Sequence, residues 1–145
     1  QYRTWYRKPR TAGDDDRDRQ LLLSEPELAK GLEYFRLGTL QVSPDGKLLA
    51  YSTDSNGAER FTLKIRDIES GRDLETVSAE TKGSVAWTAD SRGLVWTNTS
   101  PEWRSTKALL HRLGGGESRL LLEEADSRYG LFVGHTQDRR WILLG

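Results

Sequence analysis

Apolar and polar residues alternate in short runs along most of this chain, and turn-forming residues separate the runs. Between Phe61 and Arg66 the order is Phe-Thr-Leu-Lys-Ile-Arg, which is the pattern of a β-strand that buries one face. Comparable runs predict strands over about 39–43, 47–53, 60–67, 73–78, 84–88, 93–98, 107–113 and 119–123. Turns are predicted at 54–57, 69–71 and 114–116, where Gly, Ser, Asn or Asp dominate. We therefore expect an all-β fold of antiparallel strands.

One line of sequence recurs along the chain. Residues Val42 to Tyr51 read Val-Ser-Pro-Asp-Gly-Lys-Leu-Leu-Ala-Tyr, and weaker copies cover 85–96 and 132–144. The aspartates of the three copies, Asp45, Asp90 and Asp138, lie 45 and 48 residues apart. A period of about 40 to 50 residues with strand patterning is typical of β-propeller blades. In the first copy, proline presets the backbone of a tight turn and glycine tolerates the positive φ at its exit.

This period divides the chain into parts. We expect residues 1–36 to form an N-terminal strand, a loop and a short helix, and residues 37–145 to form a partial β-propeller of about two and a half blades. The predicted blades cover about 37–80 and about 83–125, and an incomplete blade covers about 129–145. The chain starts at Gln1, contains no methionine and stops just after a hydrophobic strand. We therefore expect both ends to be truncated.

The N-terminal region carries three local signals. Residues 2–9 alternate aromatic and basic residues, which indicates an edge strand or a nucleic-acid-binding stripe, and the balanced charge of the chain favours the edge strand. Ser24 with Glu27 forms a capping box, which predicts the only expected helix over about 25–30, ending at Gly31. The run Asp14-Asp15-Asp16 lacks EF-hand spacing, so we expect a solvated loop rather than a calcium site.

The composition limits the classes of partner. Lys+Arg and Asp+Glu both number 22, so no overall field attracts nucleic acid or an anionic membrane. The chain has no cysteine, which fits a reducing compartment, and no apolar run approaches the roughly 20 residues of a membrane span. We therefore expect a cytoplasmic protein with no nucleic-acid or membrane partner. Because 35% hydrophobic content is low for 145 residues, we also expect a partner to cover part of the core.

The sequence contains no recognisable catalytic or ligand-binding motif. A serine hydrolase needs a nucleophile on an elbow, commonly Gly-x-Ser-x-Gly, with a histidine base, and no such elbow occurs. We interpret His111, in a predicted strand, and His135, before a turn, as surface or turn-packing residues. Two histidines without cysteines give no zinc pattern, and the glycines at 114–116 precede no Lys-Ser or Lys-Thr that would bind phosphate. We expect no catalytic, metal-binding or cofactor-binding residue.

Two tryptophans fall at comparable places in the first two strands of a predicted blade. Trp87 and Trp96 are large enough to fill the space between neighbouring blades. A ligand-stacking platform is the alternative, and core packing is the interpretation that we favour.

The order of these motifs resembles the N-terminal β-propeller of the prolyl oligopeptidase family, and oligopeptidase B in particular. The resemblance rests on segments in the family's order: 28–38 (Leu-Ala-Lys-Gly-Leu-Glu-Tyr-Phe-Arg-Leu-Gly), 42–52, 59–67, 83–91, Trp103-Arg104, 111–114 and 122–126. Single motifs such as Ser-Pro-Asp-Gly occur in many propellers. The resemblance is specific to this family because all of these segments occur together and in the family's order.

This resemblance implies a parent serine endopeptidase with two parts. An α/β-hydrolase domain would carry the Ser-Asp-His triad, and the propeller would restrict access to short peptides, cleaved after Arg or Lys. No triad residue can be assigned to this chain, which is therefore expected to be non-catalytic by itself. Its implied partners are the missing hydrolase domain and short peptide substrates. Because so few blades cannot close a ring, self-association of the chain is also expected. A non-catalytic propeller that binds peptides or proteins is the alternative.

Overall fold

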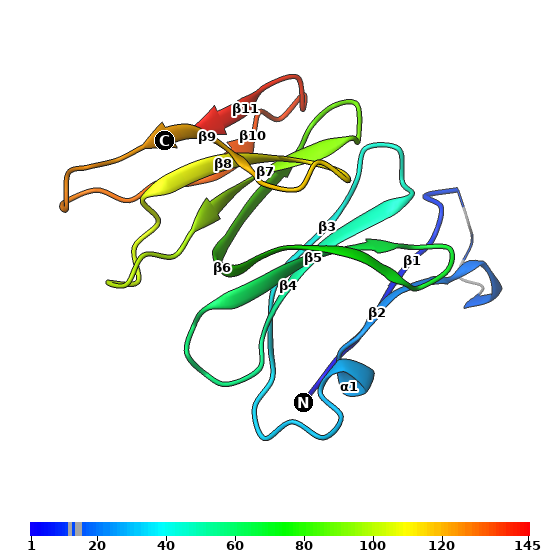
Figure 1. Cartoon of the computed structure of the whole chain (residues 1–145). Coiled ribbons are helices and arrows are strands. Elements are labelled where there is room, and N and C mark those ends of the chain that lie inside the picture. The colour runs from blue at the N-terminus through cyan, green and yellow to red at the C-terminus, as the bar shows by residue number, and fades with distance from the viewer. Residues whose placement is uncertain (12, 14–15) are drawn as a thin grey trace.

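The computed structural model describes residues 1–11, 13 and 16–145, so the predicted loop residues Asp14 and Asp15 lie outside the described residues. Within this part of the chain, seven strands form one antiparallel sheet and two further pairs of strands form hairpins (Figure 1). The elements are β1 (Thr4–Arg7), a 3-10 helix (Asp16–Asp18), β2 (Gln20–Ser24), α1 (Glu25–Leu28), β3 (Arg36–Val42), β4 (Leu48–Asp54), β5 (Phe61–Asp67), β6 (Asp73–Trp87), β7 (Gly93–Asn98), β8 (Lys107–Arg112), β9 (Arg119–Glu123), β10 (Val133–His135) and β11 (Ile142–Leu144). The predicted all-β, antiparallel fold with one short α-helix is confirmed.

The seven-stranded sheet consists of two blades that share one long strand. Blade one contains β3, β4, β5 and the first half of β6, and blade two contains the second half of β6 with β7, β8 and β9. The sequence predicted two separate strands at 73–78 and 84–88, whereas β6 runs without a break from Asp73 to Trp87. The register shifts between Thr81 and Val85, and Gly83 has a φ of 116°. The chain therefore turns from one blade into the next at a bend rather than through a loop.

The recurring sequence line forms the same turn three times. In each copy a hydroxyl donates to the aspartate at 2.6 Å, and the pairs are Ser43–Asp45, Thr88–Asp90 and Thr136–Asp138. The aspartate also accepts a bond from the backbone amide two residues later, at Lys47, Arg92 and Arg140. These side-chain bonds stabilise a turn locally. The sequence line therefore recurs because each blade contains the same turn, and each turn is stabilised by its own local hydrogen bonds.

Hydrophobic cores lie between neighbouring blades. The first joins blades one and two and consists of Ala50, Leu63, Ile65, Val85, Trp87, Leu94 and Trp96. A second core joins blade two to the β10–β11 hairpin through residues that include Ala86, Val95 and Val133. Trp87 is 2% exposed and Trp96 is 6% exposed, which confirms their prediction as core residues rather than ligand platforms.

The N-terminal hairpin packs on the other face of blade one. Leu22 and Leu23 of β2 form a core with Leu49 and Tyr51 of β4 and with Ile68. The edge strand predicted at residues 2–9 is present as β1, which pairs with β2 and, among the described residues, with no other strand. The predicted helix is shorter than expected, because α1 ends at Leu28, although the Ser24 Oγ accepts the Glu27 amide as predicted. The 3-10 helix at Asp16–Asp18 was not predicted.

Candidate functional site

The ends of the blades form two different faces. Tight turns at 43–47, 68–72, 88–92, 113–118 and 136–141 lie at one end of the strands, which we call the turn face. The segments 29–35, 55–60, 99–106 and 124–132 lie at the opposite end, which we call the connection face (Figure 1). Hydrogen bonds link neighbouring blades on each face: the Asp45 amide donates to Ser91 Oγ on the turn face, and Arg60 donates to Ser100 O on the connection face. Contacts along both faces therefore align the blades.

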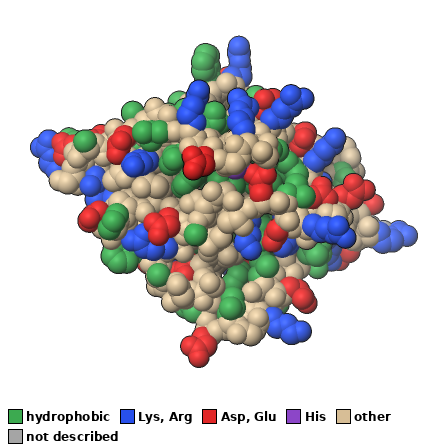
Figure 2. Space-filling model, viewed as in Figure 1, with side chains coloured by type: hydrophobic (Ala, Val, Ile, Leu, Met, Phe, Trp, Pro, Cys, Tyr) green, Lys and Arg blue, Asp and Glu red, His purple; other side chains and the backbone are tan. Residues whose placement is uncertain are grey.

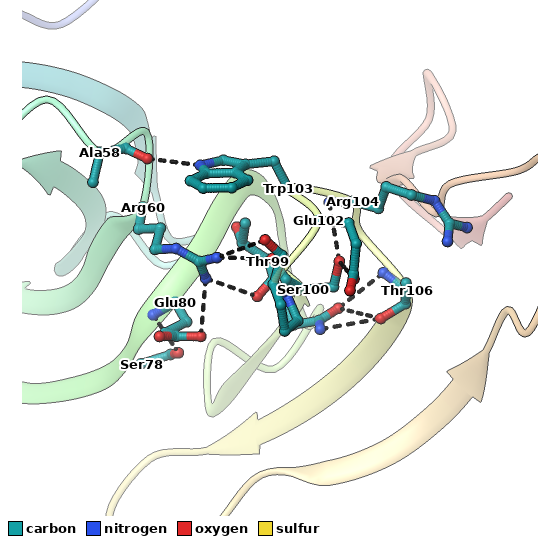
Figure 3. Close-up of polar contacts among 12 residues, drawn as sticks. Ala58, Arg60, Ser78, Glu80, Thr99, Ser100, Glu102, Trp103, Arg104 and Thr106 are labelled. Atoms are coloured by element: carbon teal, nitrogen blue, oxygen red, sulfur yellow. Dashed lines mark hydrogen bonds and ion pairs between the residues drawn. The ribbon is translucent and has the colours of Figure 1, made fainter. Parts of the chain in front are cut away.

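On the connection face, Arg60 holds the loop between β7 and β8 (Figure 3). Its guanidinium donates to three successive carbonyl oxygens, at 3.4 Å to Thr99, 3.0 Å to Ser100 and 3.3 Å to Pro101. The same group lies 3.2 Å from the Glu80 carboxylate. A planar guanidinium with five donors suits this arrangement, whereas an ammonium group could not reach all of these acceptors.

The indole of Trp103 stacks on this guanidinium (Figure 3). The Arg60 Cζ lies 4.9 Å from the ring centroid, within the range of a cation–π contact. The indole nitrogen donates to the Ala58 carbonyl at 2.8 Å, and Lys82 Nζ donates to the Trp103 carbonyl at 2.6 Å. Trp103 has a φ of 58° and remains 47% exposed. A large aromatic side chain is thus held at the surface by groups from blade one.

The rest of this loop is also anchored by polar contacts. The Asn98 Oδ1 accepts the amides of Thr106 and Lys107 at 3.0 and 2.7 Å, and Ser100 Oγ accepts the Arg104 amide at 3.2 Å. The Arg104 guanidinium donates to the Asp126 carbonyl at 2.8 Å. These bonds close the loop on itself and connect it to the segment after β9, so the loop has a defined shape.

A hollow of about 690 Å³ lies at the turn-face ends of β3, β6 and β10. These are the first strands of successive blades, which line the central channel of a propeller. The hollow is lined by residues that include Gln41, Val42, Trp87, His135 and Arg139. Trp87 Nε1 donates to the Gln41 carbonyl at 3.0 Å, and His135 Nε2 lies 2.9 Å from the Trp87 carbonyl. Side chains at the ends of β6 and β10 therefore bond to the inner strand of the preceding blade.

His111 contacts both a carboxylate and a serine, which sequence reasoning missed. Its Nε2 contacts the Glu75 carboxylate, and its Nδ1 lies 3.5 Å from Ser118 Oγ. With 3% of its area exposed, His111 is buried between the blades, so its interpretation as a surface or turn-packing residue is wrong. Ser118 lies in the turn before β9 and not on a strand–turn–helix elbow, and its Oγ accepts the Trp96 indole N–H at 3.0 Å. This geometry supports a link between blades rather than an activated nucleophile.

We next consider metal sites and membrane-spanning helices in the described part of the chain. Among the residues described, no group of three or more His, Cys, Asp or Glu side chains is placed to hold a metal ion. Nor does any described helix have the length and apolar character needed to cross a membrane.

Comparison with known proteins identifies the fold. Residues 1–145 match the family model described as "Prolyl oligopeptidase, N-terminal beta-propeller domain". The chain belongs to this family. The prolyl oligopeptidase propeller was the family expected from the order of the sequence motifs, and that expectation is confirmed.

Relatives of this propeller are several times longer than the chain. It is 34% identical over 142 residues to "Uncharacterized peptidase y4qF" of Sinorhizobium fredii, covering 97% of the chain and 18% of the relative. It is 29% identical over 136 residues to "Dipeptidyl aminopeptidase BI" of Pseudoxanthomonas mexicana, covering 92% and 19%. The structure of oligopeptidase B from Leishmania major matches with a TM-score of 0.89 at 20% identity, covering 99% and 21%. The chain thus spans about a fifth of the length of these relatives.

Proposed function

We propose that this chain is part of the propeller that gates substrate access in a serine oligopeptidase. The observation that carries the proposal is the family match over residues 1–145. A ring placed over an active site excludes folded proteins by size, so a general acyl-transfer site acts only on short peptides. In this role the chain contributes inner strands that face the channel.

The chain itself has no catalytic role in this proposal. The catalytic serine, aspartate and histidine belong to the hydrolase domain of the parent peptidase, and the contact of His111 with Glu75 and Ser118 serves the packing of the blades. The partner of the chain is therefore the hydrolase domain. A cytoplasmic location is part of the same proposal and is supported by the absence of cysteine in the chain.

Cleavage after Arg or Lys is the proposed specificity of the parent. Its support is the motif order that resembles oligopeptidase B and the fold shared with the Leishmania major enzyme. The relative named as a dipeptidyl aminopeptidase supports a competing possibility, in which two residues at a time are released from a free N-terminus.

Fluorogenic peptides can test this function. The full-length protein and this chain alone would be assayed with N-terminally blocked short peptides ending in Arg, Lys or Pro, and with unblocked dipeptide substrates. We expect cleavage of the blocked Arg and Lys peptides by the full-length protein and none by the chain alone. Cleavage restricted to unblocked dipeptides, or activity of the chain alone, would contradict the proposal.

A further inference from the structure

The hollow at the turn-face ends of β3, β6 and β10 is lined by basic side chains and, among the described residues, by no acidic ones. Its ionisable lining residues are His135 and Arg139. Over the surface visible in Figure 2, by contrast, basic and acidic side chains are interspersed. Because the formal net charge of the whole chain is zero, the hollow is a local positive site rather than part of a general positive field.

Three carboxylates lie near the hollow in the sequence, but none of them neutralises Arg139. Asp45, Asp90 and Asp138 each bind a hydroxyl and a backbone amide of their own turn. Asp90 also lies 3.3 Å from the guanidinium of Arg112. The Arg139 guanidinium itself makes no hydrogen bond or ion pair with another residue in the described part of the chain. Its N–H donors are therefore available to a ligand.

Arg139 occupies a backbone position that is unfavourable for arginine. It has a φ of 57° at the turn position that Gly46 and Ser91 hold in the first two copies of the repeat. Glycine adopts this conformation without a steric cost, and the Ser91 hydroxyl accepts the Asp45 amide at 3.0 Å. The Arg139 side chain makes no comparable bond to the described residues, so its contacts within the fold do not offset the strain. Strained residues of this kind cluster at ligand-binding sites.

The turn position of Arg139 faces the two preceding blades. In blade two the equivalent residue, Ser91, reaches back to the Asp45 amide of blade one. Arg139 lines the same hollow as Ala89 of blade two and Pro44 of blade one. The guanidinium therefore lies at the turn-face mouth of the channel that the inner strands line.

The hollow has the donors that a carboxylate requires. A guanidinium binds a carboxylate through two parallel N–H···O bonds, which are shorter and stronger than bonds between neutral groups. The side-chain amide of Gln41 also lines the hollow and makes no hydrogen bond to a described residue, so it can donate a further bond. Leu40 and Val42 supply apolar wall. A few polar donors in an apolar setting are typical of sites for small ligands.

We propose that this hollow binds the carboxylate of a peptide substrate at the mouth of the channel, and that Arg139 pairs with that carboxylate. This inference rests on the proposed function, because it takes short peptides as the molecules that enter the channel. The carboxylate belongs to a C-terminus or to an Asp or Glu side chain, which the guanidinium recognises by the same chemistry. Peptides with such a group are captured in preference to neutral peptides of the same length.

Fluorescence anisotropy with the full-length protein tests this site. Three short peptides of Ala, Ser and Gly carry a dye on the N-terminus and differ at the other end, which is a free carboxylate, an amide or an amidated glutamate. They contain no Arg or Lys, so the proposed specificity leaves them uncleaved. We expect a carboxylate peptide to bind about tenfold more tightly than the neutral amide, and the peptide that does so identifies the source of the carboxylate. Equal affinities of all three peptides, or no measurable binding of either carboxylate peptide, would overturn the proposal.

Two neighbouring arginines provide a matched pair of variants. Arg139→Gln removes the charge and the fork, and we expect it to reduce the preference for a carboxylate to less than about twofold. Arg140 is exposed in the same turn but does not line the hollow, so Arg140→Gln should keep the preference. Equal losses in the two variants would indicate general attraction to a basic turn and contradict a site at Arg139.

Arg139→Gly separates loss of binding from loss of folding. Glycine relieves the backbone strain, so this variant should lose the preference for a carboxylate without becoming less stable to urea. A preference that persists in Arg139→Gly would contradict the proposal.

The cleavage assay with blocked Arg and Lys peptides distinguishes this inference from the proposed function. A full-length protein that cleaves those peptides but binds all three dye-labelled peptides equally would reject only the carboxylate site. A protein that prefers the carboxylate through Arg139 but cleaves no peptide would reject only the proposed function.

Discussion

Individual carboxylates and backbone angles determine how each turn of this propeller closes. Asp54, at the end of β4, is 1% exposed and accepts the amides of Asn56, Gly57 and Glu59 at 3.0, 2.9 and 2.8 Å. Burial acts to raise the pKa of this carboxyl group, but the backbone hydrogen bonds outweigh burial and hold the pKa below its usual value. The charged form of Asp54 therefore stabilises the folded state.

Asp54→Asn tests this contribution through its pH dependence. Because the pKa of Asp54 is lower in the folded state, its stabilisation is complete above about pH 4 and is lost as the pH falls through the folded pKa. We expect Asp54→Asn to lower the free energy of unfolding by about 2 kcal/mol at pH 7 and by less at pH 3. Urea unfolding at the two pH values measures the difference. Glu69→Gln, in an exposed turn, is the control and should change stability by less than about 0.5 kcal/mol. A pH-independent effect of Asp54→Asn would contradict the explanation.

A second residue-scale feature is the turn position after each repeated aspartate. Gly46, Ser91 and Arg139 occupy this position with φ values of 75°, 59° and 57°. Only glycine adopts this conformation without a steric cost. Two of the three copies of the turn therefore carry backbone strain that the first avoids.

Substitutions in both directions test this strain. Gly46→Ala should lower the free energy of unfolding by about 1 kcal/mol, because the backbone angle is unfavourable for alanine, whereas the added Cβ would approach only the end of the flexible Arg7 side chain, at 3.3 Å. Arg139→Gly should raise stability by up to about 1 kcal/mol. Gly130→Ala, at a position without a positive φ and with only ordinary contact around the added Cβ, is the control for both. Unfolding in urea compares the variants, and a stabilising Gly46→Ala would disprove the strain argument.

At the scale of the elements, the inner strands β6 and β10 are each bonded to the inner strand of the preceding blade. Trp87 at the end of β6 reaches the Gln41 carbonyl of β3, and His135 at the end of β10 reaches the Trp87 carbonyl. These residues occupy the same position in the repeat. The spacing of the repeat could place Trp87 and His135 at equivalent points of two blades. It could not show the hydrogen bonds that these residues make across the boundary between blades, because the bonded residues are 46 and 48 positions apart in the sequence.

Trp87→Phe isolates the contribution of one such bond. Phenylalanine keeps most of the buried ring but removes the donor, so the Gln41 carbonyl loses a partner, and we expect a loss of about 1–3 kcal/mol in the free energy of unfolding. Trp103→Phe removes a donor in an exposed setting and should cost less than about 1 kcal/mol. Chemical unfolding of the two variants makes the comparison. Equal costs would show that burial at the channel has no special effect on the bond.

At the scale of the whole molecule, the described residues form blades but no closed ring. Large apolar residues near the β9 and β10–β11 edges are exposed by 37–66%: Leu120, Leu121, Leu122, Phe132, Trp141, Leu143 and Leu144. An apolar surface beside an unpaired strand edge promotes association. The expected self-association of the chain thus has a specific location.

Sedimentation velocity over a range of protein concentrations tests this location. The chain alone should form larger species as concentration rises, and the double variant Trp141→Lys and Leu143→Lys should shift this behaviour to at least about fivefold higher concentration, because charges on an edge oppose pairing. Leu74→Lys, at an equally exposed leucine on blade one, should leave association unchanged. A chain that is monomeric at every concentration would refute the prediction.

The sequence by itself determined the blades, their period and the family. Strand alternation and turn chemistry act between residues close in the chain, so Phe61 to Arg66 and the Ser43–Asp45 turn are recognisable without a structure. Only the tertiary structure brought Arg60 to the carbonyls of residues 99–101, joined Glu75 to His111 and showed β6 passing unbroken between two blades. Those contacts depend on how one blade packs on the next. Packing is decided by the fit of whole sheets, which leaves no local pattern in the amino-acid order.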